Sequence, residues 1–397
     1  MFVVPTAHAT RPGPDDRVIL HGGADAGEAV AVSPAGATVR TAGAEYVIGW
    51  DRVAHVHGAL AVEAEQYRDL ATLAWRARTR LERGDAVSAD PLYEELFDRL
   101  SETDGPTALS ICEGLLRCRL WRGAHARALE AWLAWVRLAG EAGGPRALAP
   151  GASHDTRRRI WEMALLPVID DQTGLVVSLP PIWMVGPSVR ALVASDAELI
   201  DPGATGPGAA RAHALAALYL HAARHEIGVR RPTPEIAPAT ASDPGFALVR
   251  DIVLARAGDE RERDSARASL RTRLDHDLPA WQEAWCRVGL GRSLVGESDE
   301  AMVMEGVVEL MHLPARFGSD QPFMTAVALA EGAAALERLG VADEAATLRQ
   351  LLTRQYAGHP AMEWEVVQAG NAIAPVSYTH LRAHETKANL VCRLLLE

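Results

Sequence analysis

The last residues of the chain hold its densest set of metal-ligating residue types, namely His380, His384, Glu385 and Cys392. On a helix, His380 and His384 share one face because they lie four positions apart, and Glu385 follows directly. A histidine pair with this spacing is one way to begin a zinc site. Taken as natural protein, this stretch would therefore predict bound metal near the C-terminus.

A different origin explains the same residues better. The closing stretch 375–397, PVSYTHLRAHETKANLVCRLLLE, contains Lys387, the single lysine among 40 basic residues. Its first half, VSYTHLRAHET, resembles one reading frame of a transposase-type sequencing adapter, and LVCRLLLE resembles a frame of the flow-cell end of that adapter. We therefore expect residues 375–397 to be read-through from a metagenomic or transcriptomic assembly, with natural sequence only up to about Ala374, and we leave them out of the fold reasoning.

A second histidine pair, His221 and His225 in LHAARHE, has the same spacing on a predicted helix. A zinc site needs a third ligand on that face, but His213 is rotated by about 80° from His221 on a helix of 3.6 residues per turn. The pair supports one alternative function, a metal-dependent hydrolase that takes its third ligand from residues 143–190. The simpler interpretation is two histidines satisfied on the surface or in a groove, and we predict no bound metal or cofactor.

Other residues of the right type for catalysis have the wrong spacing. Ser153–Asp155 spells a serine, a histidine and an aspartate in a row, but adjacent residues cannot point at one another as a catalytic triad requires. Asp170 and Asp171, like Glu94 and Glu95, are neighbours whose side chains diverge, which suits a solvated turn or helix surface better than acid–base catalysis. We predict no catalytic residue.

The composition excludes several classes of protein. The chain has 397 residues, a formal net charge of −12, 48% hydrophobic residues and 23% charged residues, as in an ordinary folded protein of two or three domains. An acidic balance argues against a nucleic-acid surface, and no run of eighteen apolar residues predicts a membrane span. Because Lys387 is the single lysine, no P-loop, pyridoxal phosphate or kinase lysine is present outside the tail.

The first residues are a leader fragment or a linker. Ala7–Ala9 fits the small-x-small pattern that precedes a signal-peptidase cut, and 2–4 could end a hydrophobic core. The alternative is a disordered N-terminus. Export to the periplasm or cell envelope follows from the first interpretation and a cytoplasmic location from the second.

Residues 15–58 read as a small β domain. Short Val- and Ile-rich segments alternate with Gly, Pro, Ala and Asp turns, which predicts four or five strands in about 45 residues. This is the size of a small closed barrel, and the layout resembles SH3-like or Sm-like barrels. Trp50 is expected in its core, with ligand stacking as the alternative.

From about Leu60 the hydrophobic period becomes helical, and four glycines mark a repeat. These are Gly84, Gly123, Gly296 and Gly340. The position five residues later is alanine in all four copies, namely Ala89, Ala128, Ala301 and Ala345. Columns eleven and seven residues before each glycine, and twelve after it, hold apolar or small residues. Agreement of several columns indicates repeated helical hairpins.

The repeat resembles the tetratricopeptide repeat (TPR), a helix–turn–helix unit with small residues where its helices touch. Intervals of 39 residues from Gly84 to Gly123 and 44 from Gly296 to Gly340 exceed the family's period of about 34, and several consensus aromatics are missing. The resemblance is therefore limited to a TPR-like hairpin solenoid, and it implies a surface that holds a protein or peptide.

Residues 143–190 interrupt this pattern. LLPVIDDQTGLVVSLPPIWMVGP contains two β-type runs around a turn, followed by two prolines and Trp183, which predicts a β-hairpin. Such an insert could close a groove between helices, or it could be a plain connector between two helical halves.

Arginines recur at matching offsets from the first two repeat glycines, and the candidate partner-binding residues are Arg78, Arg80, Arg117 and Arg119. In the TPR frame, Arg78 and Arg117 would face the concave side, and a planar guanidinium suits carboxylates. This arrangement favours an acidic peptide or chain terminus as partner. The alternative is that these arginines pair with glutamates of the chain itself.

The sequence as a whole predicts a mainly α protein, a TPR-like α-α hairpin solenoid preceded by a small all-β barrel domain. We expect a non-enzymatic scaffold that binds a protein or peptide, with the hydrolase around His221 and His225 as the alternative. The predicted segments are a leader fragment or linker (1–14), a β-barrel (15–58), helical hairpins (60–142), an insert with a β-hairpin (143–190), helical hairpins (191–372) and the tail (375–397).

Overall fold

The computed structural model describes residues 16–100, 103–141, 168–195, 205–237, 240 and 243–364. The predicted leader, the Ser153–Asp155 triplet and the histidines of the 375–397 tail lie outside these residues. The chain forms two compact units, each with its own packing. Unit 1 comprises residues 1–171 and 200–213, and unit 2 comprises residues 172–199 and 214–397.

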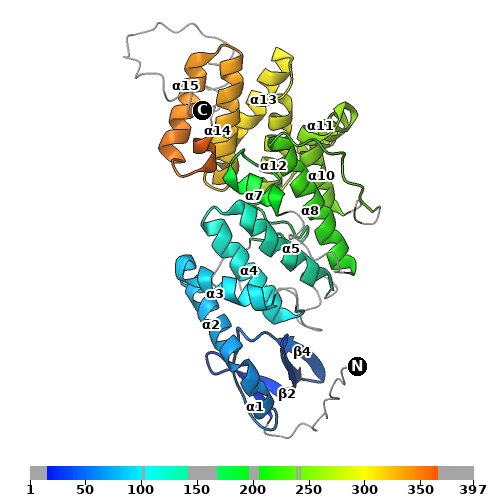
Figure 1. Ribbon diagram of the computed structural model, residues 1–397, viewed down its shortest axis with the longest axis vertical. Coiled ribbons are helices and arrows are strands. Elements are labelled where there is room, and N and C mark those ends of the chain that lie inside the picture. The colour runs from blue at the N-terminus through cyan, green and yellow to red at the C-terminus, as the bar shows by residue number, and fades with distance from the viewer. Residues whose placement is uncertain are drawn as a thin grey trace. The chain divides into compact units, whose positions relative to one another are not determined.

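Unit 1 begins with the expected small β domain, a five-stranded antiparallel sheet in the order β4-β3-β2-β1-β5. The strands are β1 (Arg17–Leu20), β2 (Asp25–Ser33), β3 (Gly36–Thr41), β4 (Ala44–Ile48) and β5 (Val53–Val56) (Figure 1). The register shifts where β1 pairs with both of its neighbours and again where β2 pairs with β3. Such bulges increase the twist, so the short strands wrap around one core.

Trp50 lies in the core of the sheet, as its sequence context predicts. Its side chain is 2% exposed and its ring stacks on Tyr67 with ring centroids 5.0 Å apart. The indole N–H donates to the carbonyl oxygen of Ser33 at 2.8 Å. Burial with a satisfied N–H is the usual state of a core tryptophan.

The helices of unit 1 pack as two hairpins in succession. After α1 (Ala61–Ala64) and the 3₁₀ turn η1 (Glu65–Tyr67) come α2 (Arg68–Glu82), α3 (Ala86–Leu100), α4 (Pro106–Trp121) and α5 (His125–Glu141). Each of the four long helices contacts the next, and α2 also contacts α4. This nearest-neighbour pattern is that of stacked helical hairpins.

Unit 2 continues with helical pairs. Its elements are α7 (Pro187–Ala194), α8 (Pro207–Glu226, in unit 2 from Ala214 on), α10 (Pro244–Ala257), α11 (Glu260–Leu274), α12 (Ala280–Leu294), α13 (Glu300–His312), the π-helical turn η3 (Leu313–Phe317), α14 (Pro322–Arg338), α15 (Ala342–Gln355) and the 3₁₀ turn η4 (Pro360–Glu363). From α10 to α15 each helix packs on the next, and α12 also contacts α10 and α14 (Figure 1). The first helix of each pair therefore lies beside the first helix of the next pair.

The four repeat glycines occupy the turns within four of these hairpins. Gly84, Gly123 and Gly340 have φ values of +78°, +69° and +77°, a region in which a side chain is strained. Alanines five positions after them are fully buried at Ala89, Ala128 and Ala345, but Ala301 in the hairpin of Gly296 is exposed. The repeat thus marks hairpins of the structure, although in one copy the alanine at this position is exposed.

Of the predicted insert, the structure describes residues 168–190, so most of the first arm of the expected β-hairpin lies outside the described residues. Single bridge positions occur at Ile169 and Val176, on either side of the expected turn, and the hairpin stays a prediction. Pro180 and Pro181 have no N–H to donate, so a paired strand cannot continue through them. Among the described helices, none is long and apolar enough to span a membrane.

Candidate functional site

A non-helical segment of the insert, with two local turns, is buried in unit 2. We call residues Leu175–Met184 the strap. Its large apolar side chains are between 0% and 7% exposed, namely Leu175, Val176, Leu179, Ile182, Trp183 and Met184. Pro181 and Ile182 lie opposite residues of α8, α10 and α12. The strap therefore covers a face to which α8, α10 and α12 contribute.

Side chains from the helices hold the main chain of the strap. Three of them donate hydrogen bonds to its carbonyl oxygens, from Trp285 Nε1 to Val177 (3.0 Å), from the Tyr219 hydroxyl to Leu179 (2.6 Å) and from the Arg292 guanidinium to Trp183 (3.2 Å). In return, Trp183 Nε1 donates to the carbonyl oxygen of Tyr219 at 3.0 Å. Contacts of this kind hold a non-helical segment by its backbone, as main-chain hydrogen bonds do in the recognition of peptides.

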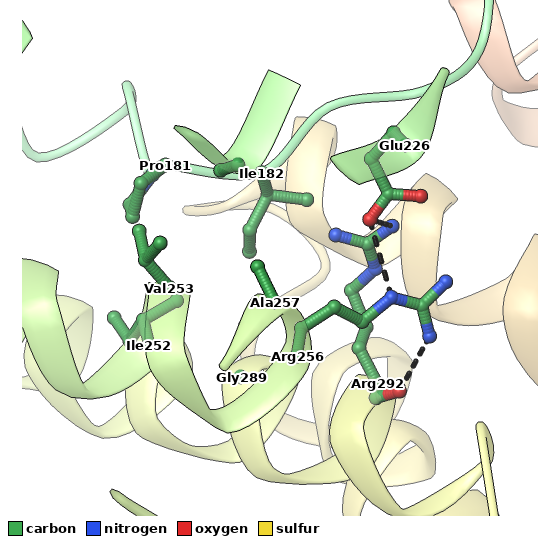
Figure 2. Close-up of a pocket in the computed structure, with 10 residues that line it drawn as sticks. Pro181, Ile182, Glu226, Ile252, Val253, Arg256, Ala257, Gly289 and Arg292 are labelled. Atoms are coloured by element: carbon green, nitrogen blue, oxygen red, sulfur yellow. Dashed lines mark hydrogen bonds and ion pairs between the residues drawn. The ribbon is translucent and has the colours of Figure 1, made fainter. Parts of the chain in front are cut away.

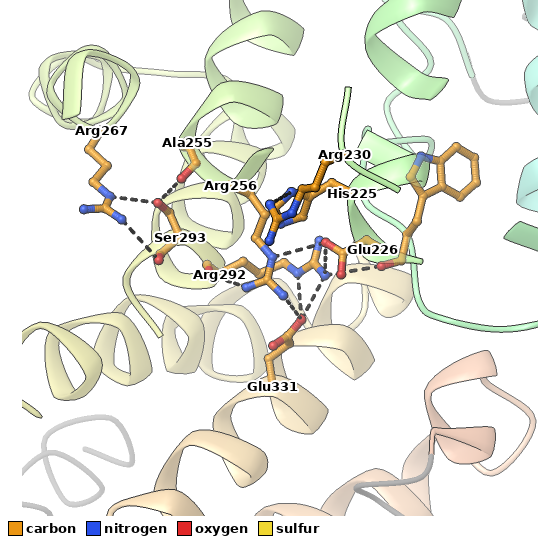
Figure 3. A network of polar contacts seen from close by, with 10 residues as sticks. His225, Glu226, Arg230, Ala255, Arg256, Arg267, Arg292, Ser293 and Glu331 are labelled. Atoms are coloured by element: carbon orange, nitrogen blue, oxygen red, sulfur yellow. Dashed lines mark hydrogen bonds and ion pairs between the residues drawn. The ribbon is translucent and has the colours of Figure 1, made fainter. Parts of the chain in front are cut away.

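A cluster of four charges lies on the same face, with one residue from each of four helices (Figure 3). The residues are Glu226 of α8, Arg256 of α10, Arg292 of α12 and Glu331 of α14. Arg256 Nε lies 3.1 Å from Glu226, and the Arg292 guanidinium lies 3.2 Å from Glu226 and 2.9 Å from Glu331. Two cations and two anions balance, so the cluster joins the helices without adding net charge.

Glu226 and Arg256 keep their charges although they are buried. Burial raises the pKa of the Glu226 carboxyl, but the charges of Arg292 and Arg256 outweigh this effect, and the pKa is lowered overall. For Arg256, burial lowers the pKa, while Glu331 and Glu226 raise it to a value above its usual range. Breaking one pair would leave an uncompensated buried charge, so the four residues depend on one another.

A small cavity separates the strap from the helices (Figure 2). Pro181 and Ile182 line it on the strap side, and the charged pair Glu226 and Arg256 lies on the opposite wall. Its volume is about 10 Å³, roughly what one water molecule needs. The cavity is therefore a packing gap under the strap and too small for a metabolite.

The histidine pair of the alternative function lies on α8 next to this cluster. His221 is 4% exposed, and Nδ1 of His225 lies 3.1 Å from the guanidinium of Arg230. Burial lowers the pKa of both histidines, that of His225 to about 4, so both are neutral at pH 7. Neutral imidazole can bind metal, but no group of three potential ligands occurs among the described residues.

The candidate partner-binding arginines are directed into the chain itself. Arg78 contacts Asp51 and Glu82, Arg117 contacts Glu113, and Arg119 contacts Glu94 and Glu130, at 2.7–2.9 Å. Arg80 donates to the carbonyl oxygen of Ser88 at 2.8 Å. Arg78 and Arg117 are 8% exposed and Arg119 is 1% exposed. These contacts match the alternative of internal pairing, and binding of an acidic partner by these arginines stays a prediction.

Asp51 is the residue that the sequence did not single out. Its Oδ2 accepts from Arg78 at 2.7 Å and from the hydroxyl of Ser110 at 3.0 Å, which ties the turn between β4 and β5 to α2 and α4. Nearby, Thr107 Oγ1 donates to the carbonyl oxygen of Ala35 at 2.6 Å. The sheet is thereby fixed to the first helices of both hairpins in unit 1. A lone aspartate after a strand gives no sequence signal for such a role.

Comparisons of the chain with protein-family models, with curated proteins and with solved structures found no match.

Proposed function

We propose that the chain is a non-enzymatic scaffold that binds a protein or peptide through its helical hairpins. The observation that carries this proposal is the strap, because helices α8 and α12 of unit 2 already hold a non-helical segment by its carbonyl oxygens. A helical face that binds backbone groups has the chemistry that peptide binding requires.

The repeat and the sheet support a finer version of the proposal, in which the helices are a TPR-like solenoid and the sheet is an SH3-like or Sm-like barrel. Glycine turns with small buried residues beside them, as at Gly84 with Ala89, favour the TPR-like geometry. In the sheet, β1 pairs with both β2 and β5, which brings the last strand back beside the first. Such a return is what a small barrel needs.

The test is a selection of peptides on the immobilised full chain from a random display library. A scaffold of this kind should enrich a convergent set of peptides, and the synthetic peptides should bind in titration calorimetry with one site per chain. A parallel selection on an unrelated acidic protein removes peptides that bind by charge alone. Enrichment of no convergent set would contradict the proposal.

A further inference from the structure

We propose that the strap is a built-in ligand, and that the face of unit 2 accepts an uncharged, apolar peptide in exchange for it. This inference rests on the proposed scaffold function and names the surface and the chemistry of its partner. Three features of unit 2 support it, namely how the strap is attached, what remains when it leaves, and what its own sequence contains.

The strap is attached by side chains and lacks a ladder of main-chain hydrogen bonds to the helices. The backbone bonds within it are local, from Leu179 N to the carbonyl of Val176 at 2.9 Å and from Ile182 N to the carbonyl of Pro180 at 2.7 Å. In the described residues, no main-chain hydrogen bond joins the strap to a helix, so its release breaks no hydrogen bond within the helices. Release costs the burial of its apolar side chains, and a peptide that buries the same kind of side chains on this face would restore that gain.

The helical face is held together by contacts that do not involve the strap. Arg292 has carboxylate partners on α8 and α14, and Arg256 has partners on the same two helices. Opening would remove one hydrogen bond from this cluster, the one from Arg292 to the carbonyl of Trp183. Because the four charges stay paired, the face remains organised for an incoming chain. A small cavity remains between Pro181, Ile182 and the helices, so the strap does not cover the helical face completely (Figure 2).

The strap defines the chemistry of the exchanging peptide. Residues 172–187, QTGLVVSLPPIWMVGP, include no charged side chain. The two prolines favour an extended backbone and lower the entropy lost on binding. Trp183 then fills a buried position, edge-on to Tyr219 with ring centroids 6.2 Å apart. We infer a partner segment with paired prolines, an aliphatic residue and an aromatic residue in this order.

The first test measures hydrogen exchange on the full chain by mass spectrometry. Amides of the strap should exchange at least about tenfold faster than those of α12, because they open locally. Tyr219→Phe removes only the hydroxyl that donates to Leu179, so it should accelerate exchange of the strap and leave α12 unchanged. Tyr93→Phe is the matched control, since the Tyr93 hydroxyl is buried and has no hydrogen-bond partner in the described structure. Exchange of the strap at the rate of α12 in every variant would overturn the proposal.

The second test adds a fluorescent peptide of residues 172–187 to the full chain and follows anisotropy. Ile182→Asp places a charge in the apolar contact and should release the strap, so this variant should bind the peptide at least about tenfold more tightly than wild type does. Val229→Asp makes a similar change at a position of unit 2 that is 39% exposed, and it should bind as wild type. A scrambled peptide should bind neither variant.

The exchange of the strap for a peptide can be tested whether or not Ile182→Asp folds. A helical, cooperatively melting Ile182→Asp chain that fails to bind the peptide overturns the exchange. If Ile182→Asp does not fold, Tyr219→Phe takes its place in the peptide titration, and binding no tighter than that of Tyr93→Phe overturns it. Failure here leaves the scaffold function intact when the display selection still converges, so the two proposals can fail separately.

Discussion

Arg78 on α2 and Asp51 in the turn between β4 and β5 form an ion pair of 2.7 Å between side chains that are 10% and 4% exposed. The pair joins the sheet of unit 1 to its first helical hairpin, and Ser110 on α4 donates to the same carboxylate oxygen. A buried pair that connects two elements in this way makes the position of each depend on the other. Its removal therefore has consequences for stability that a surface arginine would not have.

We expect Arg78→Ala to destabilise the protein by about 3–5 kcal/mol, because Asp51 would be left charged, buried and without its cation. Arg76→Ala is the control on the same helix, since Arg76 is exposed, and it should change stability by less than about 0.5 kcal/mol. Urea denaturation followed by circular dichroism measures both. Equal stabilities of the two variants would show that the pair adds nothing. If Arg78→Ala does lose stability, weaker partner binding by this variant could result from its lower stability and would not show that Arg78 contacts a partner.

The charge cluster of unit 2 should make stability depend on pH. The pKa of Glu226 is lowered in the folded protein, whereas in the unfolded chain a glutamate has a pKa of about 4.3. A lowered acid pKa contributes stability that is present above the unfolded value and is lost as pH falls through the folded value. Glu226→Gln should therefore be less stable than wild type at pH 7, and the difference should shrink below about pH 4.3.

Chemical denaturation at several pH values between neutrality and acid measures this difference. Glu63→Gln, at an exposed position of α1, provides the control and should follow the wild-type curve throughout. A difference between Glu226→Gln and wild type that is constant over the whole range would show that Glu226 loses no charge interaction on acidification.

Loss of the hydroxyl group should change the stability of the protein differently at two buried tyrosines. Tyr219→Phe removes a donor to Leu179 at 2.6 Å, so we expect a loss of about 1–2 kcal/mol. Tyr93→Phe removes a buried hydroxyl that has no partner in the described structure, so the change should be neutral or stabilising. Thermal unfolding of both variants measures the difference, and equal effects would contradict it.

The histidine pair on α8 gives a test of the hydrolase alternative. Among the described residues, no third ligand joins His221 and His225, so we expect less than about 0.1 zinc per purified chain. Elemental analysis after overnight incubation with zinc and desalting measures this content. Zinc bound one per chain in wild type and lost in His225→Ala would replace the scaffold proposal with a metal site.

The sequence by itself determined the local architecture. Alternation of apolar residues predicted the sheet, and glycines with alanines five positions later predicted the hairpin turns, as at Gly84 and Gly123. These signals are readable because backbone conformation and the side-chain period are set by neighbours in sequence. The β-hairpin predicted within residues 143–190 stays a prediction, because most of its first arm lies outside the described residues.

Only the tertiary structure decided which surfaces are free. The strap meets its helices through contacts between residues 36 to 109 positions apart, as from Trp183 to Tyr219 and from Arg292 to Trp183, and no periodicity encodes such a pairing. The arginines show the same limit. The sequence shows that Arg78 and Arg117 occupy matching positions on α2 and α4. Which carboxylates they contact depends on the neighbouring segments that pack against these helices. A charged side chain goes where its desolvation is best compensated, and the complete set of neighbours determines that place.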